Sequence, residues 1–138
     1  MSPSVVVTGA GGYVGGRLVT SLLGEGFHVL PIVRQPVEWL PVAATVLDLA
    51  AVDEATLVRA FDGHDAVVHL AGPNEVESVR TPDTAMATTL AAARRVAAAA
   101  RSASVGRFVV ASTVHVYGAA AAPRAVLTTA TVPQPRHP

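Results

Sequence analysis

A β-branched apolar run that stops at a cluster of glycines constrains the fold of this chain most. Residues 5–8 are Val-Val-Val-Thr, and a helix-spaced apolar pattern follows the glycines. This order predicts a strand, a tight turn and a helix. In a dinucleotide-binding turn, Gly9 allows the sharp turn, Gly12 lets the backbone approach a pyrophosphate, and Gly15 lets the helix pack close to the sheet. The helix N-terminus then offers N–H groups and a partial positive charge to the phosphates.

The same glycines also fit a simpler interpretation, a strand-to-helix connection without a ligand. The context favours nucleotide binding, because the apolar run precedes the turn and Val14, Leu18 and Leu22 follow it at helical spacing. We expect these three side chains to form the buried face of the helix.

The composition bounds the class of protein. A chain of 138 residues with 51% hydrophobic residues can form one globular domain. Cysteine is absent, which excludes disulfides and thiolate chemistry, and lysine is absent as well. The N-terminus lacks the basic start of a signal peptide, and no apolar run approaches the roughly 18–20 residues of a membrane span. We expect a cytoplasmic protein with no membrane partner.

Charge is unevenly distributed although the formal net charge is zero. Residues 1–83 hold ten carboxylates and four arginines, whereas residues 84–138 hold six arginines and no carboxylate. A basic surface for nucleic acid is one interpretation of the second half. The arginines are few and no aromatic residues are interleaved with them, so we expect no nucleic-acid partner.

Apolar runs alternate with helix-spaced segments along the chain. This alternation predicts an α/β fold, a Rossmann-type doubly wound parallel sheet of about five strands with right-handed crossovers. Pro31 is awkward within the second strand, because proline donates no ladder hydrogen bond. The predicted strands are 4–8, 28–33, 44–47, 65–70 and 107–112, and the predicted helices are 12–23, about 53–63 and 84–103.

The helix at 84–103 is rich in alanine. A polar loop at 74–82 is expected before it, with Asp83 as its N-terminal cap. Homodimerisation through this helix is one expected assembly. Its predicted apolar face comprises Met86, Leu90, Ala93, Ala97 and Ala100.

The end of the second strand bears on cofactor choice. An acidic residue about 20 positions after the glycines would bind the ribose 2′-hydroxyl of NAD, but Arg34 occupies that region. Its planar fork of donors suits a 2′-phosphate, which favours NADP over NAD, unless Arg34 is a solvated loop residue. Asp48 could contact an adenine amino group or cap a turn. His69 is better explained as a packed core histidine than as a catalytic one.

Four stretches together resemble the extended short-chain dehydrogenase/reductase family, the NAD-dependent epimerase/dehydratase group. The resemblance spans about residues 4–118, and the region ending at Arg34 is most similar to the NADP-using reductases. The four stretches are Thr8-Gly9-x-x-Gly12-x-x-Gly15, Asp65-x-Val67-x-His69-x-Ala71-Gly72, Gly106-Arg107-Phe108-Val109 and Ser112-Thr113-x-x-Val116-Tyr117-Gly118.

The resemblance implies a role for particular residues. A serine or threonine after the fifth strand contacts the substrate oxygen in the family, which points to Thr113, with Ser112 as second choice. The residues implied at the cofactor are Gly9, Gly12 and Gly15 in the dinucleotide turn, Tyr13 and Val14 beside the pyrophosphate, Arg34 at the 2′-phosphate, Asp48 and Leu49 at the adenine, and Leu70, Ala71 and Gly72 at the adenine-side ribose.

The chain departs from the family at its end. Family enzymes use a Tyr-x-x-x-Lys pair about twenty residues beyond the Val-Tyr-Gly stretch, where the lysine lowers the pKa of the tyrosine from about 10. That position falls close to Pro138, and Tyr117 is no substitute because Gly-Ala-Ala-Ala follows it. The asparagine that the family places on the preceding helix maps near Thr89. We therefore expect a truncated or frameshifted member of the family.

Two domains and three functions follow as expectations. Residues 1–118 would form an NAD(P)-binding domain, and the Pro/Ala/Thr-rich residues 119–138 a disordered tail. The first function is the dinucleotide module of an epimerase, dehydratase or reductase, with a small-molecule substrate only if a further C-terminal part completes it. The alternatives are a non-catalytic dinucleotide sensor or subunit, and an inert fragment with an exposed sheet edge.

Overall fold

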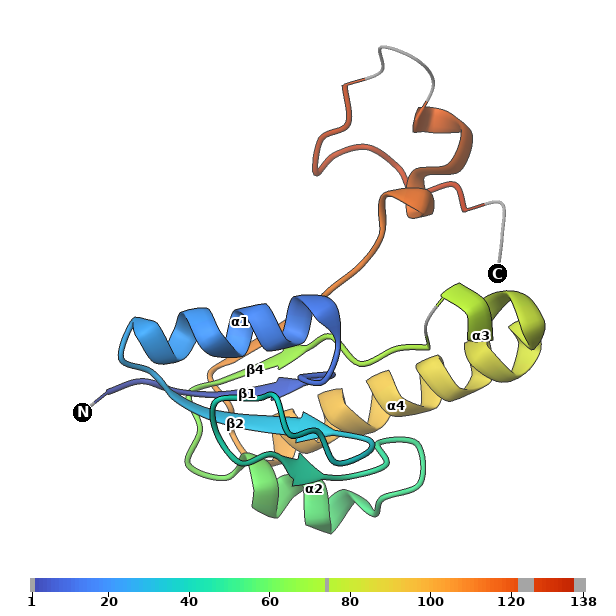
Figure 1. Ribbon diagram of the computed structural model, residues 1–138. Helices are drawn as coiled ribbons and strands as arrows, with labels where there is room; N and C mark the ends of the chain where they lie inside the picture. Colours follow the sequence, from blue (N-terminus) through green and yellow to red (C-terminus); the bar gives the residue numbers. More distant parts are fainter. Residues whose placement is uncertain (1, 74, 122–125, 136–138) are drawn as a thin grey trace.

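A computed structural model describes residues 2–73, 75–121 and 126–135 (Figure 1). Strands and helices alternate along most of the chain, as predicted, and the second and third strands follow each other without a helix between them. In order, the elements are β1 Ser4–Thr8, α1 Tyr13–Gly24, β2 His28–Val33, β3 Thr45–Val46, α2 Glu54–Phe61, β4 Ala66–His69, α3 Glu75–Arg80, α4 Pro82–Ser102, β5 Arg107–Val110 and the 3-10 segment η1 Val114–Ala121.

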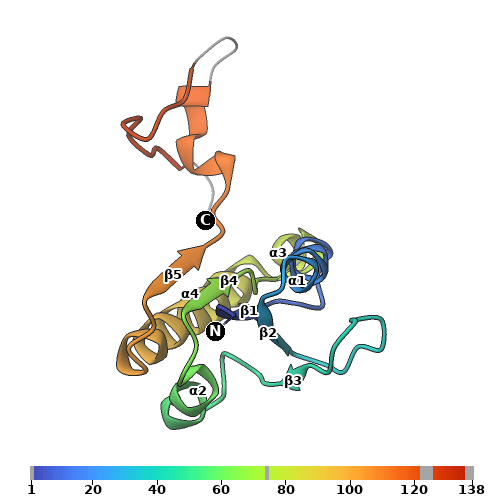
Figure 2. The ribbon, with the colours of Figure 1, turned by 90° about the vertical axis from the view of Figure 1, so that its left-hand side faces the viewer.

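The five strands form one parallel sheet in the order β3-β2-β1-β4-β5. Figure 2 shows this order across the sheet, with β5 at one edge and β3 at the other. The chain leaves β1 toward β2 and β3 and then returns to the other side of β1 with β4. The predicted α/β doubly wound fold is confirmed, and the reversal of direction falls beside β1.

Helices cover both faces of the sheet and bury alternate residues of β1. Val5 and Val7 pack on the α1 side with Ala10, Val19 and Leu40. Val6 packs on the opposite side, in a larger cluster with residues of α2 and α4. Figure 1 shows α1 on one side of the sheet and α2 on the other. Burial on both faces explains why β1 is a continuous apolar run.

Pro31 lies within β2 without breaking the sheet. The His28 N–H donates to the Pro3 carbonyl, so even-numbered N–H groups of β2 face β1 and odd-numbered ones face β3. Pairing between β2 and β3 begins only at Ile32. The N–H that Pro31 lacks therefore points beyond the start of β3, where no ladder bond is lost.

Two predicted helix faces are confirmed only in part, since Leu18 and Leu22 of α1 pack against the core and Ala100 of α4 is buried. In α1 the buried residues are Gly15, Gly16 and Val19, whereas Val14 is 62% exposed. Because Gly15 and Gly16 have no side chain, the side of α1 that carries them can lie closest to the sheet. In α4 the buried residues are Ala85, Ala92, Val96, Ala99 and Ala100, whereas Met86 and Leu90 of the predicted face are exposed.

The boundaries around α4 also differ from the prediction. The expected polar loop holds the short helix α3, and α4 begins at Pro82, with Thr81 rather than Asp83 at the cap position. Proline is favourable at the first helical position, where its missing N–H would have no partner within the helix. The helix α2 has Asp53 at its N-terminal cap position. Asp53 Oδ1 accepts the Thr56 N–H at 2.8 Å, and hydrogen bonds from Thr56 lower the pKa of Asp53.

The chain beyond β5 projects from the sheet (Figure 2). η1 contains a kink at Gly118, and the Gln134 N–H donates to the Val116 carbonyl at 2.9 Å. Within the predicted tail, residues 122–125 and 136–138 lie outside the described residues, so its disorder stays a prediction. In the described parts of the chain, no helix is both long and apolar enough to span a bilayer.

Candidate functional site: a cleft at the carboxyl edge of the sheet

A cleft of about 590 Å³ opens where the parallel strands end. Its wall combines segments from five parts of the chain, all at the carboxyl edge or on α4. The size lies within the range of small-molecule sites, and the place is the crevice in which open α/β sheets bind ligands. The lining residues are Gly9, Gly11, Gly12, Ile32, Val33, Arg34, Gln35, Val37, Leu47, Asp48, Leu49, Ala50, Leu70, Ala71, Gly72, Pro73, Thr88, Thr89 and Ala92.

Glycine is required at two points of the turn between β1 and α1. Gly9 has a φ of +69°, and a Cβ there would lie 2.6 Å from the backbone nitrogen of Ala71. A Cβ on Gly15 would collide with the carbonyl oxygen of Gly9. These contacts bring the turn against the end of β4 and seat α1 on the turn. The N-terminus of α1, with N–H groups that have no acceptor within the helix, therefore lies beside the cleft.

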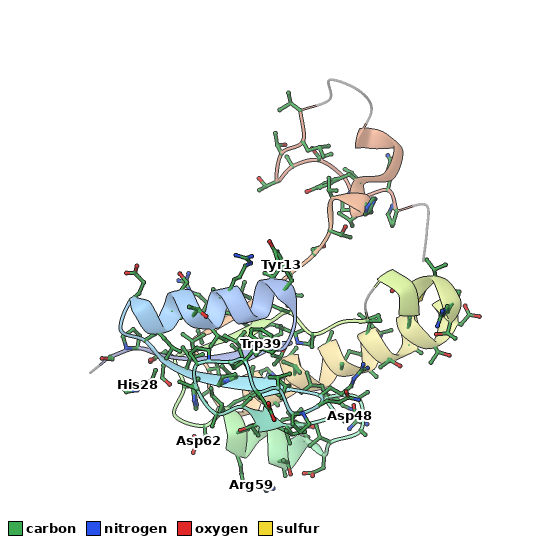
Figure 3. The ribbon with its side chains drawn as sticks, in the orientation of Figure 1. Tyr13, His28, Trp39, Asp48, Arg59 and Asp62 are labelled. Carbon is green, nitrogen blue, oxygen red and sulfur yellow. The ribbon has the colours of Figure 1, made fainter. Side chains whose placement is uncertain are left out.

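Arg34 and Asp48 both line the cleft, as predicted for residues after β2 and β3. Asp48 also caps a turn, since its Oδ1 accepts the Ala50 N–H at 3.0 Å. The two interpretations of Asp48 are therefore compatible. Leu49 is 7% exposed and joins the core beneath the cleft floor. Figure 3 shows Asp48 at the same end of the sheet as the start of α1.

β4 is joined to β1 by side chains at both ends of the Asp-x-Val-x-His motif. Asp65 Oδ2 accepts the Ser4 N–H at 2.7 Å, and the Thr8 hydroxyl lies 2.7 Å from His69 Nδ1. Thr8 and His69 are buried, and burial lowers the pKa of His69 below 6.5. The predicted packed core histidine is thus confirmed, and it is hydrogen-bonded to Thr8. The pair holds Leu70 and Ala71 at the cleft edge.

Several predicted site residues lie outside the cleft lining. Tyr13 is 77% exposed, and its ring stacks against the Arg17 guanidinium at 4.4 Å on the outer side of α1 (Figure 3). Thr113 and Ser112 are exposed after β5, and the Thr113 hydroxyl accepts the His115 N–H at 3.3 Å. Val14 is also exposed, and Gly15 acts beneath the turn rather than in the cleft wall.

The prediction missed much of the wall, including Gln35, Val37 and Pro73. These residues have no distinctive chemistry, so only the path of the chain brings them to the cleft. Thr88 and Thr89 reach it from α4. The family pattern was the one available signal for Thr89, because it maps a helix asparagine near that position.

The strand order and the position of the cleft define a Rossmann-type α/β domain. The sequence model of the NAD dependent epimerase/dehydratase family matches residues 5–138. This chain belongs to that family.

Individual relatives agree with this assignment. An L-arabinose 1-dehydrogenase (NAD(P)(+)) of Haloferax volcanii is 36% identical over 82% of this chain. A bifunctional dihydroflavonol 4-reductase/flavanone 4-reductase of Pyrus communis is 40% identical over 59% of it. The chain spans only 42% and 26% of the lengths of these two enzymes.

Solved structures show the same architecture. MoeE5 in complex with UDP-glucose and NAD superimposes with a TM-score of 0.82 and 30% identity, covering 97% of this chain and 43% of MoeE5. The UDP-glucose 4-epimerase of Bifidobacterium longum, in complex with NAD+ and UDP, superimposes with a TM-score of 0.79 and 26% identity, covering 95% of this chain and 42% of the epimerase.

Proposed function

We propose that this chain is an NAD(P)-binding module of an epimerase, dehydratase or reductase, with a preference for NADP. The supporting observation is the cleft itself, in which the glycine turn, the end of β2 and the end of β4 converge. The structural relatives MoeE5 and the Bifidobacterium longum epimerase hold NAD. The pyrophosphate would lie at Gly9 and Gly12, beside the N-terminus of α1.

Arg34 supports the preference for NADP. It lines the cleft directly after β2, where a carboxylate would otherwise select the 2′-hydroxyl of NAD. Asp48 and Leu49 would flank the adenine, and Leu70, Ala71 and Gly72 the adjacent ribose. A guanidinium can bind a phosphate through two parallel hydrogen bonds, and such charge-assisted bonds are stronger than neutral ones.

Catalysis by this chain alone is not part of the proposal. The family reaction passes a hydride between the nicotinamide and a carbinol or carbonyl carbon, and a Tyr/Lys pair manages the proton. The 138 residues contain no lysine. Thr113, or Ser112, stays the predicted contact for the substrate oxygen, and a substrate would require a further C-terminal part. The alternative functions are a dinucleotide sensor or subunit, and an inert fragment.

Two further expectations belong to the same proposal. The exposed side chains of Met86 and Leu90 support a homodimer through residues 84–103 of the α4 region. A cytoplasmic location and the absence of nucleic-acid or membrane partners stay predictions from composition.

Titration of the purified chain with NADPH and NADH, followed by cofactor fluorescence, tests the proposal. We expect saturable binding that Gly12→Val abolishes, because its side chain would fill the pyrophosphate position. Arg34→Gln should weaken NADPH binding by about 10-fold or more and leave NADH nearly unchanged. Arg101→Gln is the matched control, since it removes an exposed arginine outside the cleft lining. A cooperatively folded chain that binds neither cofactor would refute the module.

A further inference from the structure

The connection between β2 and β3 forms one wall of the cleft. Residues 34–44 run without helix or strand, and Arg34, Gln35 and Val37 line the cleft. Such a segment needs side-chain anchors to hold one position, because no backbone ladder fixes it. Leu40 is one anchor, since it is 9% exposed in the core cluster on the α1 side.

Trp39 supplies a second anchor, on α1. A Cβ built on Gly16 would collide with the Cη2 and Cζ3 atoms of the Trp39 ring. Gly16 is a buried residue inside α1, where glycine is an unfavourable choice for the helix. The ring contact explains why a glycine stands there, because the bare helix backbone leaves room for the indole. Figure 3 shows Trp39 next to α1.

Trp39 contacts α1 with only part of its surface. Trp39 keeps 57% of its surface exposed, so its loss would release the connection without opening the core. Val37 lines the cleft two residues before Trp39, and its Cγ1 lies 3.4 Å from the position that a Cβ on Gly11 would take. The segment from Arg34 through Val37 to Trp39 thus connects the proposed 2′-phosphate position to α1.

We propose that Trp39, seated on Gly16, is a positioning residue that fixes the Arg34–Val37 wall of the cleft and thereby sets selectivity for the 2′-phosphate of the dinucleotide. The selectivity part rests on the proposed function. The contact between Trp39 and Gly16 that holds this wall, here called the clamp, does not rest on it, because it concerns only contacts within the chain. Bidentate phosphate binding depends on the placement of the guanidinium, so a mobile wall should weaken NADPH more than NADH.

A thermal double-mutant cycle tests the clamp. Gly16→Ala should lower the melting temperature by about 3–10 °C in the presence of Trp39, because the new methyl group displaces the ring. In a Trp39→Ala background the same change should lower the melting temperature much less, because the ring is gone and the remaining close neighbour of the new methyl group is the Ala10 carbonyl oxygen at 3.3 Å. Gly24→Ala is the matched control in the same helix, because a Cβ added there would have no tertiary neighbour within 4 Å. Its effect on the melting temperature should not depend on Trp39. Equal effects of Gly16→Ala in both backgrounds would overturn the clamp.

Limited trypsin digestion tests the position of the wall without cofactor. Cleavage after Arg34 reports opening of the connection, and cleavage after Arg59, within α2, reports wider unfolding. Trp39→Ala should speed the first cleavage about 10-fold relative to the second, and Trp39→Phe should restore most of the protection. An unchanged ratio would contradict the proposal.

The selectivity part requires the cofactor titrations. Trp39→Ala should raise the NADPH dissociation constant about 5-fold more than the NADH one, with Trp39→Phe close to the parent chain. Equal loss for both cofactors would refute the role in selectivity. If the parent chain binds neither cofactor, the proposed function and the selectivity role fail together, and the melting and digestion results still decide the clamp.

Discussion

β1 and β5 have similar sequences and opposite surroundings. β1 contains Val5, Val6 and Val7, each no more than 5% exposed. β5 contains Phe108, Val109 and Val110, which are 37%, 43% and 50% exposed. Apolar, β-branched composition therefore indicates a strand in both places, but it does not report how much covers that strand.

The position in the sheet explains the difference. β1 lies between β2 and β4, with α1 on one face and the α2–α4 cluster on the other. Among the described residues β5 pairs with β4 alone, and the chain after it projects away. A strand in this position exposes both apolar side chains and ladder groups.

The largest expected difference between the two strands is in core truncation. Val6→Ala should lower the free energy of unfolding by about 2–3 kcal/mol, because it leaves a cavity in the cluster around Phe61. Val109→Ala removes the same atoms from a half-exposed position and should cost less than about 0.5 kcal/mol. Urea denaturation of both variants measures the contrast. Similar losses would mean that β5 is covered in solution.

A smaller effect is expected at the link between β1 and β4. Burial lowers the pKa of His69 below 6.5, so the unfolded chain binds a proton more readily than the folded one. The contribution of neutral His69 to the free energy of unfolding should be fully present above about pH 6.5. It should decrease as the pH falls below that value toward the lower pKa of the folded state.

His69→Asn isolates this contribution. The amide can replace Nδ1 as the partner of the Thr8 hydroxyl, and it does not titrate. Melting temperatures measured between about pH 7.5 and about pH 5.5 should fall more steeply for the parent chain than for the variant. Parallel pH profiles would show that His69 does not link folding to protonation.

The smallest effect on stability is expected at the exposed edge. Val110→Lys should change the free energy of unfolding by less than about 0.5 kcal/mol, because half of this side chain already contacts solvent. A lysine on an edge strand opposes pairing with another chain. Light scattering should therefore show self-association at higher protein concentration for the variant. The same threshold for both proteins would exclude β5 as the associating edge.

Local patterns predicted most of the fold. Strand β1 and the helix that follows the glycine turn can be predicted because Val5–Thr8 and the glycines depend on neighbours in the chain. The faces of α1 and α4 were predicted less well, because alanine and glycine give a weak apolar stripe and the packing partners decide the rotation. Asp83 was the expected cap of α4, but the helix begins at Pro82, two residues earlier than predicted.

The residues of the site also divide into those with a local signal in the sequence and those that only the tertiary structure places. Gly9, Arg34 and Asp48 were predicted because each follows a strand and parallel strands end at one edge, whereas the Leu70–Gly72 segment was implied by the family resemblance. Val37, Thr88 and the ring of Trp39 against Gly16 have no local signal, since each depends on residues distant in the chain.

The amino-acid sequence by itself determined the order of the elements, the tight turn at Gly9 and the end of the sheet at which a ligand would bind, because backbone sterics and periodicity act over a few residues. Only the tertiary structure decided which apolar residues are covered, since burial depends on neighbours that the fold brings together. That is why Val6 and Val109, alike in sequence, differ in exposure, and why Trp39 and Gly16 form a pair.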